Sequence, residues 1–375
     1  MTTRRKFFEQ ATVASISLGP GACRVATAAD APGGPWTLEV LGDIHFDKLS
    51  HHDMDWVARE KPDSIRQIES YSETTEKNYP KLLQKLKMEV AADSTCQSVI
   101  QVGDLVQGLC GSEPLARIQC EEAIASLRDL DLGIPTWITK GNHDITGPGA
   151  LEAYEKFVVP FCGASDAPKP SPNPSQFTRE QNGWLVVMYD GYANGSLDWL
   201  ENILANREPG RLIFVVHQPV VPYNARSAWG VYVKASQSEK RERLMRLLGK
   251  HRAVVLSGHL HKHSFVERDT AEGPFTQLAV CSVANRLDGE ARDLITGIEN
   301  YTPDLVDLEP NHSPKTIDAR RAILAAEKPY IRRFDYGAFW GRVKLHISGD
   351  KIEAGIYQML SDEPWKTIDL APGQA

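Results

Sequence analysis

The sequence predicts an α/β fold in which helices cover β-sheets. Short apolar runs alternate with amphipathic segments along most of the chain, which is typical of layered α/β proteins. The composition is that of an ordinary globular protein, since 42% of the 375 residues are hydrophobic and 24% are charged. This balance excludes disordered, collagen-like and coiled-coil chains, and the length suffices for one large domain or two ordinary ones.

The expected strands are short apolar runs bounded by polar or turn residues. In the first two thirds of the chain we expect strands at 36–41, 98–102, 135–139, 184–188, 212–216 and 253–256. The C-terminal part adds strands at 264–266, 277–280, 341–347 and 351–357, the last two joined as a hairpin. Apolar residues recur at helical spacing in four segments, so we expect helices at 79–90, 113–130, 196–205 and 237–248.

Residues 1–31 differ in composition from the rest of the chain. They open with Arg4-Arg5-Lys6, continue with a weakly apolar stretch and end in two A-x-A patterns at 26–31. The segment resembles a twin-arginine signal peptide, so we expect cleavage after Ala31, the twin-arginine export machinery as a partner and a periplasmic or secreted product. A frayed basic terminus of a cytosolic protein is the alternative. The apolar stretch is shorter than the ~20 residues of a spanning helix, so no permanent membrane anchor is expected.

The remaining chain is expected to form one domain from 32 to 360, followed by a C-terminal tail at 361–375. The segment 287–328 has no clear strand period and is interpreted as an inserted excursion of helix and loop. The polar stretch 46–78 is interpreted as a second insertion, with His51 and His52 in a loop. The chain carries a formal net charge of −7 and has no long basic run, so we expect no nucleic-acid footprint.

Short polar motifs follow five of the expected strands. In open α/β sheets, ligands bind outside the carboxyl ends of the strands, so these motifs are expected to meet at one site. The motifs are Gly42-Asp43-Ile44-His45, Gly103-Asp104, Gly141-Asn142-His143-Asp144, His217 and Gly258-His259-Leu260-His261.

The motifs contain side chains of the kinds that bind divalent metal ions. Carboxylate, amide and imidazole donors together suit manganese, iron(II) or zinc, and the lack of thiolates excludes a closed structural zinc site. Two ions ~3.5–4 Å apart need a bridging carboxylate, for which Asp104 is the best candidate. His143 is not needed as a ligand and is free to donate a proton. The candidate ligands are Asp43, His45, Asp104, Asn142, His217, His259 and His261.

In this order, the motifs D-x-H, GD, GNHD, H and GHxH resemble those of the calcineurin-like metallophosphoesterase family, over residues 36 to about 357. The resemblance implies a four-layer α/β/β/α sandwich with a two-metal site at the carboxyl ends of the strands. It also implies in-line attack on a phosphate ester by a hydroxide that bridges the ions, with His143 as general acid and Asp144 orienting its ring. By position, one ion is assigned Asp43, His45, Asp104 and His261, and the other is assigned Asp104, Asn142, His217 and His259.

Two subfamilies fit the motifs less well. Purple acid phosphatases place Tyr three residues after the bridging Asp, where this chain has Gln107, so a coloured iron–tyrosinate site is not implied. Ser/Thr protein phosphatases carry an Arg after GD and a Glu after GNH, and neither feature is present. A Ser/Thr protein phosphatase is therefore disfavoured.

The segment after His217 is a candidate substrate loop. Tyr223 and Arg226 lie in it beside Trp229, and an arginine flanked by aromatic residues suits a phosphate ester, although an ordinary solvated loop is an equal alternative. Because only Arg226 stands out as an extra cation near the motifs, we expect phosphodiesters to be favoured over the more charged monoesters. The alternatives are a phosphomonoesterase of the same fold and a non-catalytic metal-binding scaffold. The sequence leaves the metal, the substrate and the oligomeric state open.

Overall fold

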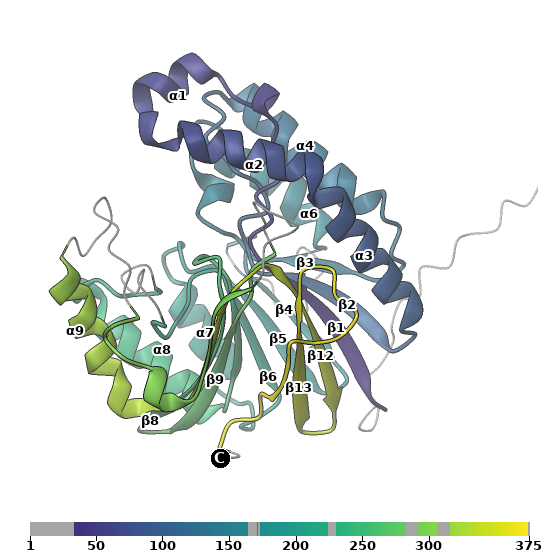
Figure 1. Cartoon of the computed structure of the whole chain (residues 1–375). Helices are drawn as coiled ribbons and strands as arrows, with labels where there is room; N and C mark the ends of the chain where they lie inside the picture. The colour runs from purple at the N-terminus through teal and green to yellow at the C-terminus, as the bar shows by residue number, and fades with distance from the viewer. Residues whose placement is uncertain are drawn as a thin grey trace, which may run out of the picture. The chain divides into compact units, whose positions relative to one another are not determined.

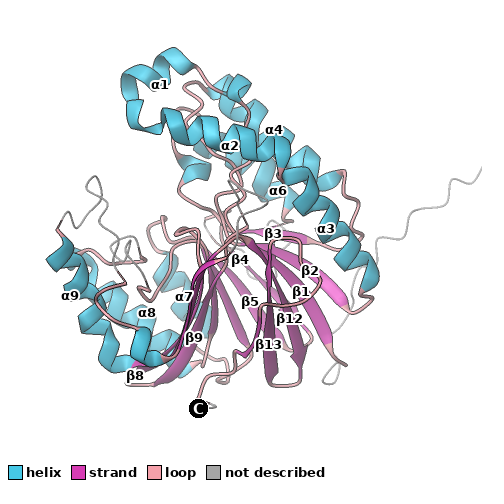
Figure 2. Cartoon of the chain, in the orientation of Figure 1, coloured by secondary structure: helices cyan, strands magenta, loops and turns pink. Residues whose placement is uncertain are grey.

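The computed structural model describes residues 34–163, 171, 173–223, 230–282, 291–305 and 316–373. All of them belong to one compact unit that spans Pro32–Ala375. Two β-sheets with helices on their outer faces confirm the predicted α/β fold class (Figures 1 and 2). The predicted signal peptide at 1–31 and the candidate substrate residue Arg226 lie outside the described residues.

The first sheet has six strands in the order β14-β13-β12-β1-β2-β3. Within it, β1 pairs parallel with β2 and antiparallel with β12. The predicted hairpin joins β12 to β13, with Ser348 opposite Lys351 at the turn. The strands are β1 (Trp36–Leu41), β2 (Cys96–Gln101), β3 (Thr136–Ile138), β12 (Gly341–Ser348), β13 (Lys351–Gln358) and β14 (Lys366–Asp369).

The second sheet has eight strands in the order β10-β11-β8-β9-β7-β6-β5-β4. Its centre is parallel, because β6 pairs parallel with both β5 and β7. The strands are β4 (Phe177–Gln181), β5 (Trp184–Tyr189), β6 (Leu212–Val216), β7 (Val254–Ser257), β8 (His263–Thr270), β9 (Gly273–Ala279), β10 (Arg292–Thr296) and β11 (Ile331–Ala338).

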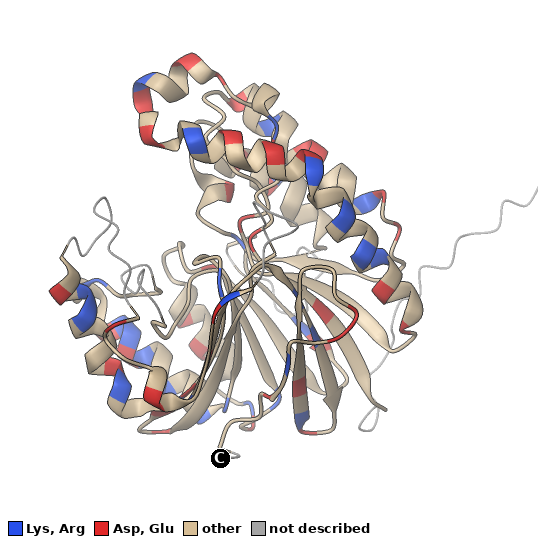
Figure 3. Ribbon diagram, viewed as in Figure 1, with Lys and Arg blue, Asp and Glu red and all other residues tan. Residues whose placement is uncertain are grey.

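Helices cover the outer faces of both sheets, and several shorter helices occur in the segments that connect these elements. Among the covering helices, α3 and α4 lie beside the first sheet and α7 and α8 beside the second (Figure 1). Charged side chains are interspersed along the outer helices, including α2, α3, α8 and α9 (Figure 3). The helices are α1 (Met54–Glu60), α2 (Ile65–Lys77), α3 (Tyr79–Ala92), α4 (Glu113–Arg128), α5 (Ala150–Ala153), α6 (Val159–Phe161), α7 (Ser196–Leu204), α8 (Ser238–Lys250) and α9 (Ile317–Glu327).

The central strands of the second sheet, β5, β6 and β7, are buried on both faces, so successive residues enter different cores. Val186 and Met188 of β5 pack into the core shared with the first sheet. Val187 and Tyr189 of the same strand pack into the core that includes Leu200 of α7. Alternation of side chains along a strand explains this division. The four layers α/β/β/α follow directly from it.

Several elements escaped the sequence prediction, mostly at the edges of the sheets. The expected tail at 361–375 contains β14, which pairs with β13, and the expected excursion at 287–328 contains β10, which pairs with β11, as well as α9. Edge strands need no continuous apolar pattern because one side of each is open; four of the five residues of β10 are exposed. The stretch 46–78 contains α1 and α2.

Two further findings concern the whole described region. Its five cysteines, at 96, 110, 120, 162 and 281, are all buried, and none of them forms a disulfide there. Among the described residues, no helix is long and apolar enough to cross a membrane.

Candidate metal centre

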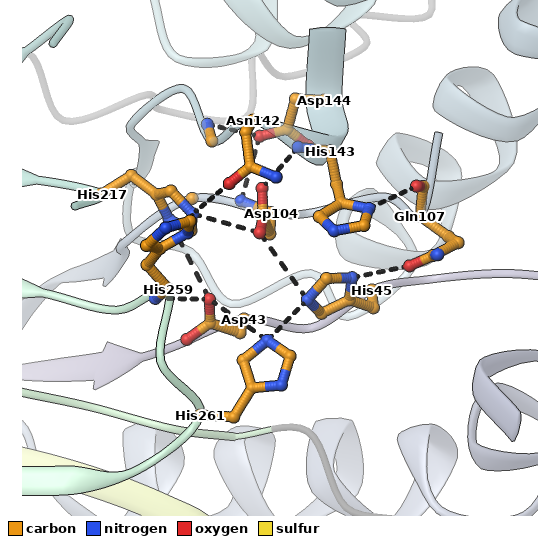
Figure 4. A network of polar contacts seen from close by, with 12 residues as sticks. Asp43, His45, Asp104, Gln107, Asn142, His143, Asp144, His217, His259 and His261 are labelled. Atoms are coloured by element: carbon orange, nitrogen blue, oxygen red, sulfur yellow. Dashed lines mark hydrogen bonds and ion pairs between the residues drawn. The ribbon is translucent and has the colours of Figure 1, made fainter. Parts of the chain in front are cut away.

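The polar motifs lie in loops at the carboxyl ends of β1, β2, β3, β6 and β7, and their side chains point toward one another (Figure 4). Main-chain hydrogen bonds join the loops in pairs. The His45 N–H donates to the Asp104 carbonyl at 2.9 Å, and the Gly258 N–H donates to the His217 carbonyl at 2.9 Å. The predicted convergence of the five motifs at one edge is therefore observed.

The backbone turns sharply at four of the predicted ligands. His45, Asp104, His259 and His261 have φ values of 49°, 53°, 74° and 53°, in the left-handed region that costs energy for residues other than glycine. Such conformations persist where the surrounding structure fixes them, and they concentrate at functional sites. The strain here falls on the residues whose side chains form the cluster.

Two glycines in the motifs are required by close packing. A Cβ atom at Gly141 would lie 2.1 Å from Asp104 Oδ1, and one at Gly103 would lie 2.5 Å from His217 Nδ1. Gly103 also has a φ of 98°, which glycine adopts without strain. The glycines therefore let neighbouring motifs approach the cluster.

The first group of possible ligands is Asp43, His45 and His261, whose ligand atoms lie within 4.8 Å of one another. The Nε2 atoms of the two histidines are 3.0 Å apart, and His261 Nε2 is 3.8 Å from Asp43 Oδ1. His45 Nδ1 donates to Gln107 Oε1 at 2.8 Å, because an amide oxygen can only accept. Its Nε2 is therefore left with a lone pair that faces the group.

The second group is Asp104, His217 and His259, again within 4.8 Å. His217 Nε2 lies 3.0 Å from Asp104 Oδ2, 3.2 Å from Asn142 Oδ1 and 3.1 Å from His259 Nδ1. His217 Nδ1 donates to the Val102 carbonyl at 2.9 Å, which leaves Nε2 to face these partners. Asn142 thus joins the second group, as the sequence predicted.

Asp104 lies between the two groups. Its Oδ2 is 3.0 Å from His217 Nε2 and 3.7 Å from His45 Nε2. Although burial raises the pKa of this carboxyl, His217 and His143 outweigh it and hold the pKa well below its usual range. The carboxylate that sequence reasoning chose as a bridge is therefore the one that contacts both groups.

The donor set fits divalent ions. Asp43 Oδ2 is buried without a hydrogen-bond partner among the described residues, although a buried carboxylate oxygen normally has one. Burial raises the pKa of Asp43 to about 8, although the charge of His217 lowers it. Burial and His143 lower the pKa of His45 to about 3, so its imidazole stays neutral, as a metal ligand must be.

His143 also lies at the cluster: its ring centroid is 4.7 Å from that of His45, and with His45 and Asp104 it forms a third group whose ligand atoms lie within 4.8 Å of one another. Its Nδ1 donates to the Gln107 carbonyl at 2.8 Å. The expectation that Asp144 orients this ring is wrong, because both carboxylate oxygens of Asp144 accept main-chain N–H groups. They accept from Asp104 and Gly141 at 3.0 and 2.8 Å and from Val106 at 3.1 Å. Asp144 therefore holds the loops of the second and third motifs together. The ring of His143 is oriented by the carbonyl of Gln107, for which a sequence motif gives no signal.

The structure gives no support to Tyr223 as a substrate contact. Its side chain is fully buried in the core of the second sheet, with its ring 6.4 Å from that of Tyr336. Tyr223 lies among the apolar residues of this core, and the main-chain N–H groups of Val220 and Val221 before it donate to Gln277 Oε1 of β9. Its predicted companion Arg226 lies outside the described residues.

Two residues near the cluster were not predicted as site residues. Gln107 was noted only for not being tyrosine, yet it binds His45 through its side chain and His143 through its carbonyl. Tyr71 of α2 stacks on His45 with ring centroids 4.3 Å apart. Its distance from the motifs in the sequence leaves no local signal.

The fold and the site define the class of metal-dependent phosphoesterases. The sequence profile described as "Calcineurin-like phosphoesterase" matches residues 39–263, well over half of the chain. The chain therefore belongs to the calcineurin-like phosphoesterase family. No curated protein matches the sequence.

Solved structures are similar to this chain at low sequence identity. A dimetal phosphatase from Danio rerio has a TM-score of 0.50 and 9% identity, with 91% of this chain and 100% of that chain covered. A purple acid phosphatase from yellow lupin seeds has a TM-score of 0.47 and 13% identity, with 90% of this chain covered; this chain spans only 54% of its length. PhoD has a TM-score of 0.48 and 12% identity, with 91% of this chain and 70% of that chain covered.

Proposed function

We propose that this protein is an exported hydrolase that uses two divalent ions to cleave phosphate esters, with phosphodiesters as its preferred class. The observation that carries the proposal is the position of Asp104, whose carboxylate contacts the histidines of both groups. Asp43, His45, Asp104 and His261 would hold one ion. Asp104, Asn142, His217 and His259 would hold the other.

The bound ions would supply Lewis-acid stabilisation of charge on the phosphoryl oxygens and would lower the pKa of water. The chain itself supplies the proton. Because His143 Nδ1 keeps its hydrogen on the Gln107 carbonyl, the ring can exchange a proton only at Nε2. A protonated Nε2 can donate to the departing oxygen of an ester, which is the role of a general acid.

The charges around the cluster support the proposed preference for diesters. Within the described residues, the ion pairs of Asp43 and Asp104 are all formed with histidines and none with Lys or Arg. Lys140, next to the third motif, is paired with Asp190 at 2.5 Å. A monoester dianion gains more from additional cations than a diester does, whereas a diester with an alkoxide leaving group gains more from a proton donor. His143 and this charge pattern together favour the diester.

A substrate comparison tests the activity and its class. The protein reconstituted with Mn²⁺ is assayed on bis(p-nitrophenyl) phosphate and on p-nitrophenyl phosphate, with chelator-treated protein as the control. We expect a higher kcat/KM for the diester and loss of both activities without metal. A monoester preference of ~10-fold or more, equivalent to about 1.4 kcal/mol, would overturn the diester class. Metal-replete but inert protein would favour the scaffold alternative.

The export part of the proposal rests on the sequence of residues 1–31. Changing Arg4 and Arg5 together to Lys keeps the charge but removes the paired guanidinium groups, so we expect the precursor to stay in the cytoplasm. Arg24→Lys makes the same chemical change outside the pair and serves as the matched control. Fractionation of cells that express each variant measures the outcome, and an unchanged periplasmic yield for the double variant would contradict the signal.

A further inference from the structure

A helix of the insertion reaches the cluster through one side chain. Tyr71 lies in the middle of α2 and is 6% exposed. Its ring stacks on that of His45, with centroids 4.3 Å apart and an interplanar angle of 9°. Its hydroxyl lies 3.3 Å from Nδ1 of His261. Tyr71 therefore contacts both histidines of the first group.

Binding of an ion at Nε2 would require one tautomer of His261. A neutral imidazole has one N–H, so an Nε2 that binds an ion requires the hydrogen on Nδ1. That N–H then donates to the Tyr71 hydroxyl oxygen. The side chain of Gln67, which lies one helical turn earlier, also hydrogen bonds with this hydroxyl.

The helix that carries Tyr71 is tied to the first motif. Ser72 Oγ donates to Asp47 Oδ2 at 3.0 Å, and the Asp47 N–H donates to Thr75 Oγ1 at 2.8 Å. Asp47 follows His45 by two residues and also accepts from Gln119 of α4 at 2.7 Å. These hydrogen bonds of Asp47 therefore hold α2, which carries Tyr71, against the segment that carries His45.

We propose that Tyr71 is a positioning residue for one metal ion only, the ion assigned to Asp43, His45 and His261. Its ring fixes the plane of His45, and its hydroxyl oxygen accepts from Nδ1 of His261 in the tautomer that an ion at Nε2 requires. The ion assigned to His217 and His259 does not depend on it, because the Val102 carbonyl orients His217. This inference rests on the proposed two-metal function and gives the insertion 46–78 a role in it.

Tyr71→Phe tests the hydroxyl without removing the ring. Tyr79→Phe is the matched control, since Tyr79 is equally buried and its hydroxyl bonds Ser126 at 2.9 Å, away from the cluster. Full-length protein is titrated with Mn²⁺, and free Mn²⁺ is counted by its electron paramagnetic resonance signal. For Tyr71→Phe we expect one of the two dissociation constants to rise ~10-fold, as is usual when the hydrogen-bond partner of a ligand is lost. The other constant should stay as in the wild type.

Two further measurements separate a positioning role from a structural one. Tyr71→Leu, which also removes the stacked ring, should weaken the same ion more than Tyr71→Phe does. Thermal unfolding of the metal-free proteins should place Tyr71→Phe close to Tyr79→Phe. Wild-type constants in Tyr71→Phe, or an equal loss at both sites, would overturn the inference while leaving the two-metal function intact. A wild-type protein that binds no Mn²⁺ would overturn both.

Discussion

The two ends of the metal cluster are oriented by different kinds of groups. At one end, the main-chain carbonyl of Val102 holds Nδ1 of His217 at 2.9 Å. At the other end, the side chain of Gln107 holds Nδ1 of His45 at 2.8 Å, and Tyr71 covers the ring of the same histidine. One end thus depends on the course of a strand, and the other depends on side chains from a loop and an inserted helix.

This difference has a consequence for substitutions. A carbonyl at the end of a buried strand keeps its position whatever side chain its residue carries, as long as the strand forms. A glutamine or tyrosine can be replaced without disturbing the strands. We therefore expect the His217 end to tolerate changes around it and the His45 end to be adjustable, which makes the two ions separable by experiment.

Asp104→Asn should have the largest effect, because it acts on both ends at once. The substitution removes the negative charge that lies 3.0 Å from His217 Nε2 and 3.7 Å from His45 Nε2. We expect both ions to be lost on dialysis and kcat/KM to fall at least ~10⁴-fold, or about 5.5 kcal/mol. Elemental analysis measures the metal, and Asp93→Asn, which alters a carboxylate paired with Lys344 instead, is the control. Two tightly held ions in Asp104→Asn would refute the bridging role.

His143→Ala should affect catalysis and neither ion. Its ring is not among the ligands assigned to the ions, and its Nδ1 is bound to a carbonyl. We expect full metal content and a fall in kcat of ~10²- to 10⁴-fold for a diester with an alkoxide leaving group. A p-nitrophenolate leaving group needs no proton, so its kcat should fall much less, which provides an internal control. Undiminished activity on the alkoxide substrate would show that another group is the acid.

The clustering of the candidate ligands could be predicted from the sequence because each motif follows a strand that has a strong local signal. The strands at 36–41 and 212–216 were predicted with the bounds observed for β1 and β6, and their apolar residues are fully or almost fully buried. The carboxyl ends of such strands share one edge, so Asp43 and His217 could be placed together without a structure. The order of the five motifs along the chain, which resembles that of the family, then indicated the remaining candidate ligands.

The orienting groups could not be predicted for physical reasons. Helix α2 buries Ser72, Thr74 and Thr75 as well as Tyr71, so its buried face has little apolar periodicity. The contact between Tyr71 and His45 joins residues that are far apart in the sequence, so no local motif contains both. The same limit explains the error over Asp144, since the acceptor for His143 is a carbonyl, and every residue has one.

Gln107→Leu should have the smallest effect and distinguishes best between the ends. Leucine has a similar size but cannot accept from His45 Nδ1, so the tautomer with a lone pair on Nε2 loses its support. The Gln107 carbonyl that binds His143 remains, and so does the Val102 carbonyl that binds His217. We therefore expect one Mn²⁺ dissociation constant to rise ~10-fold, the other to stay unchanged, and the difference between alkoxide and p-nitrophenolate leaving groups to match the wild type. An equal weakening of both ions would mean that the two ends share their orienting groups, and the comparison between them would fail.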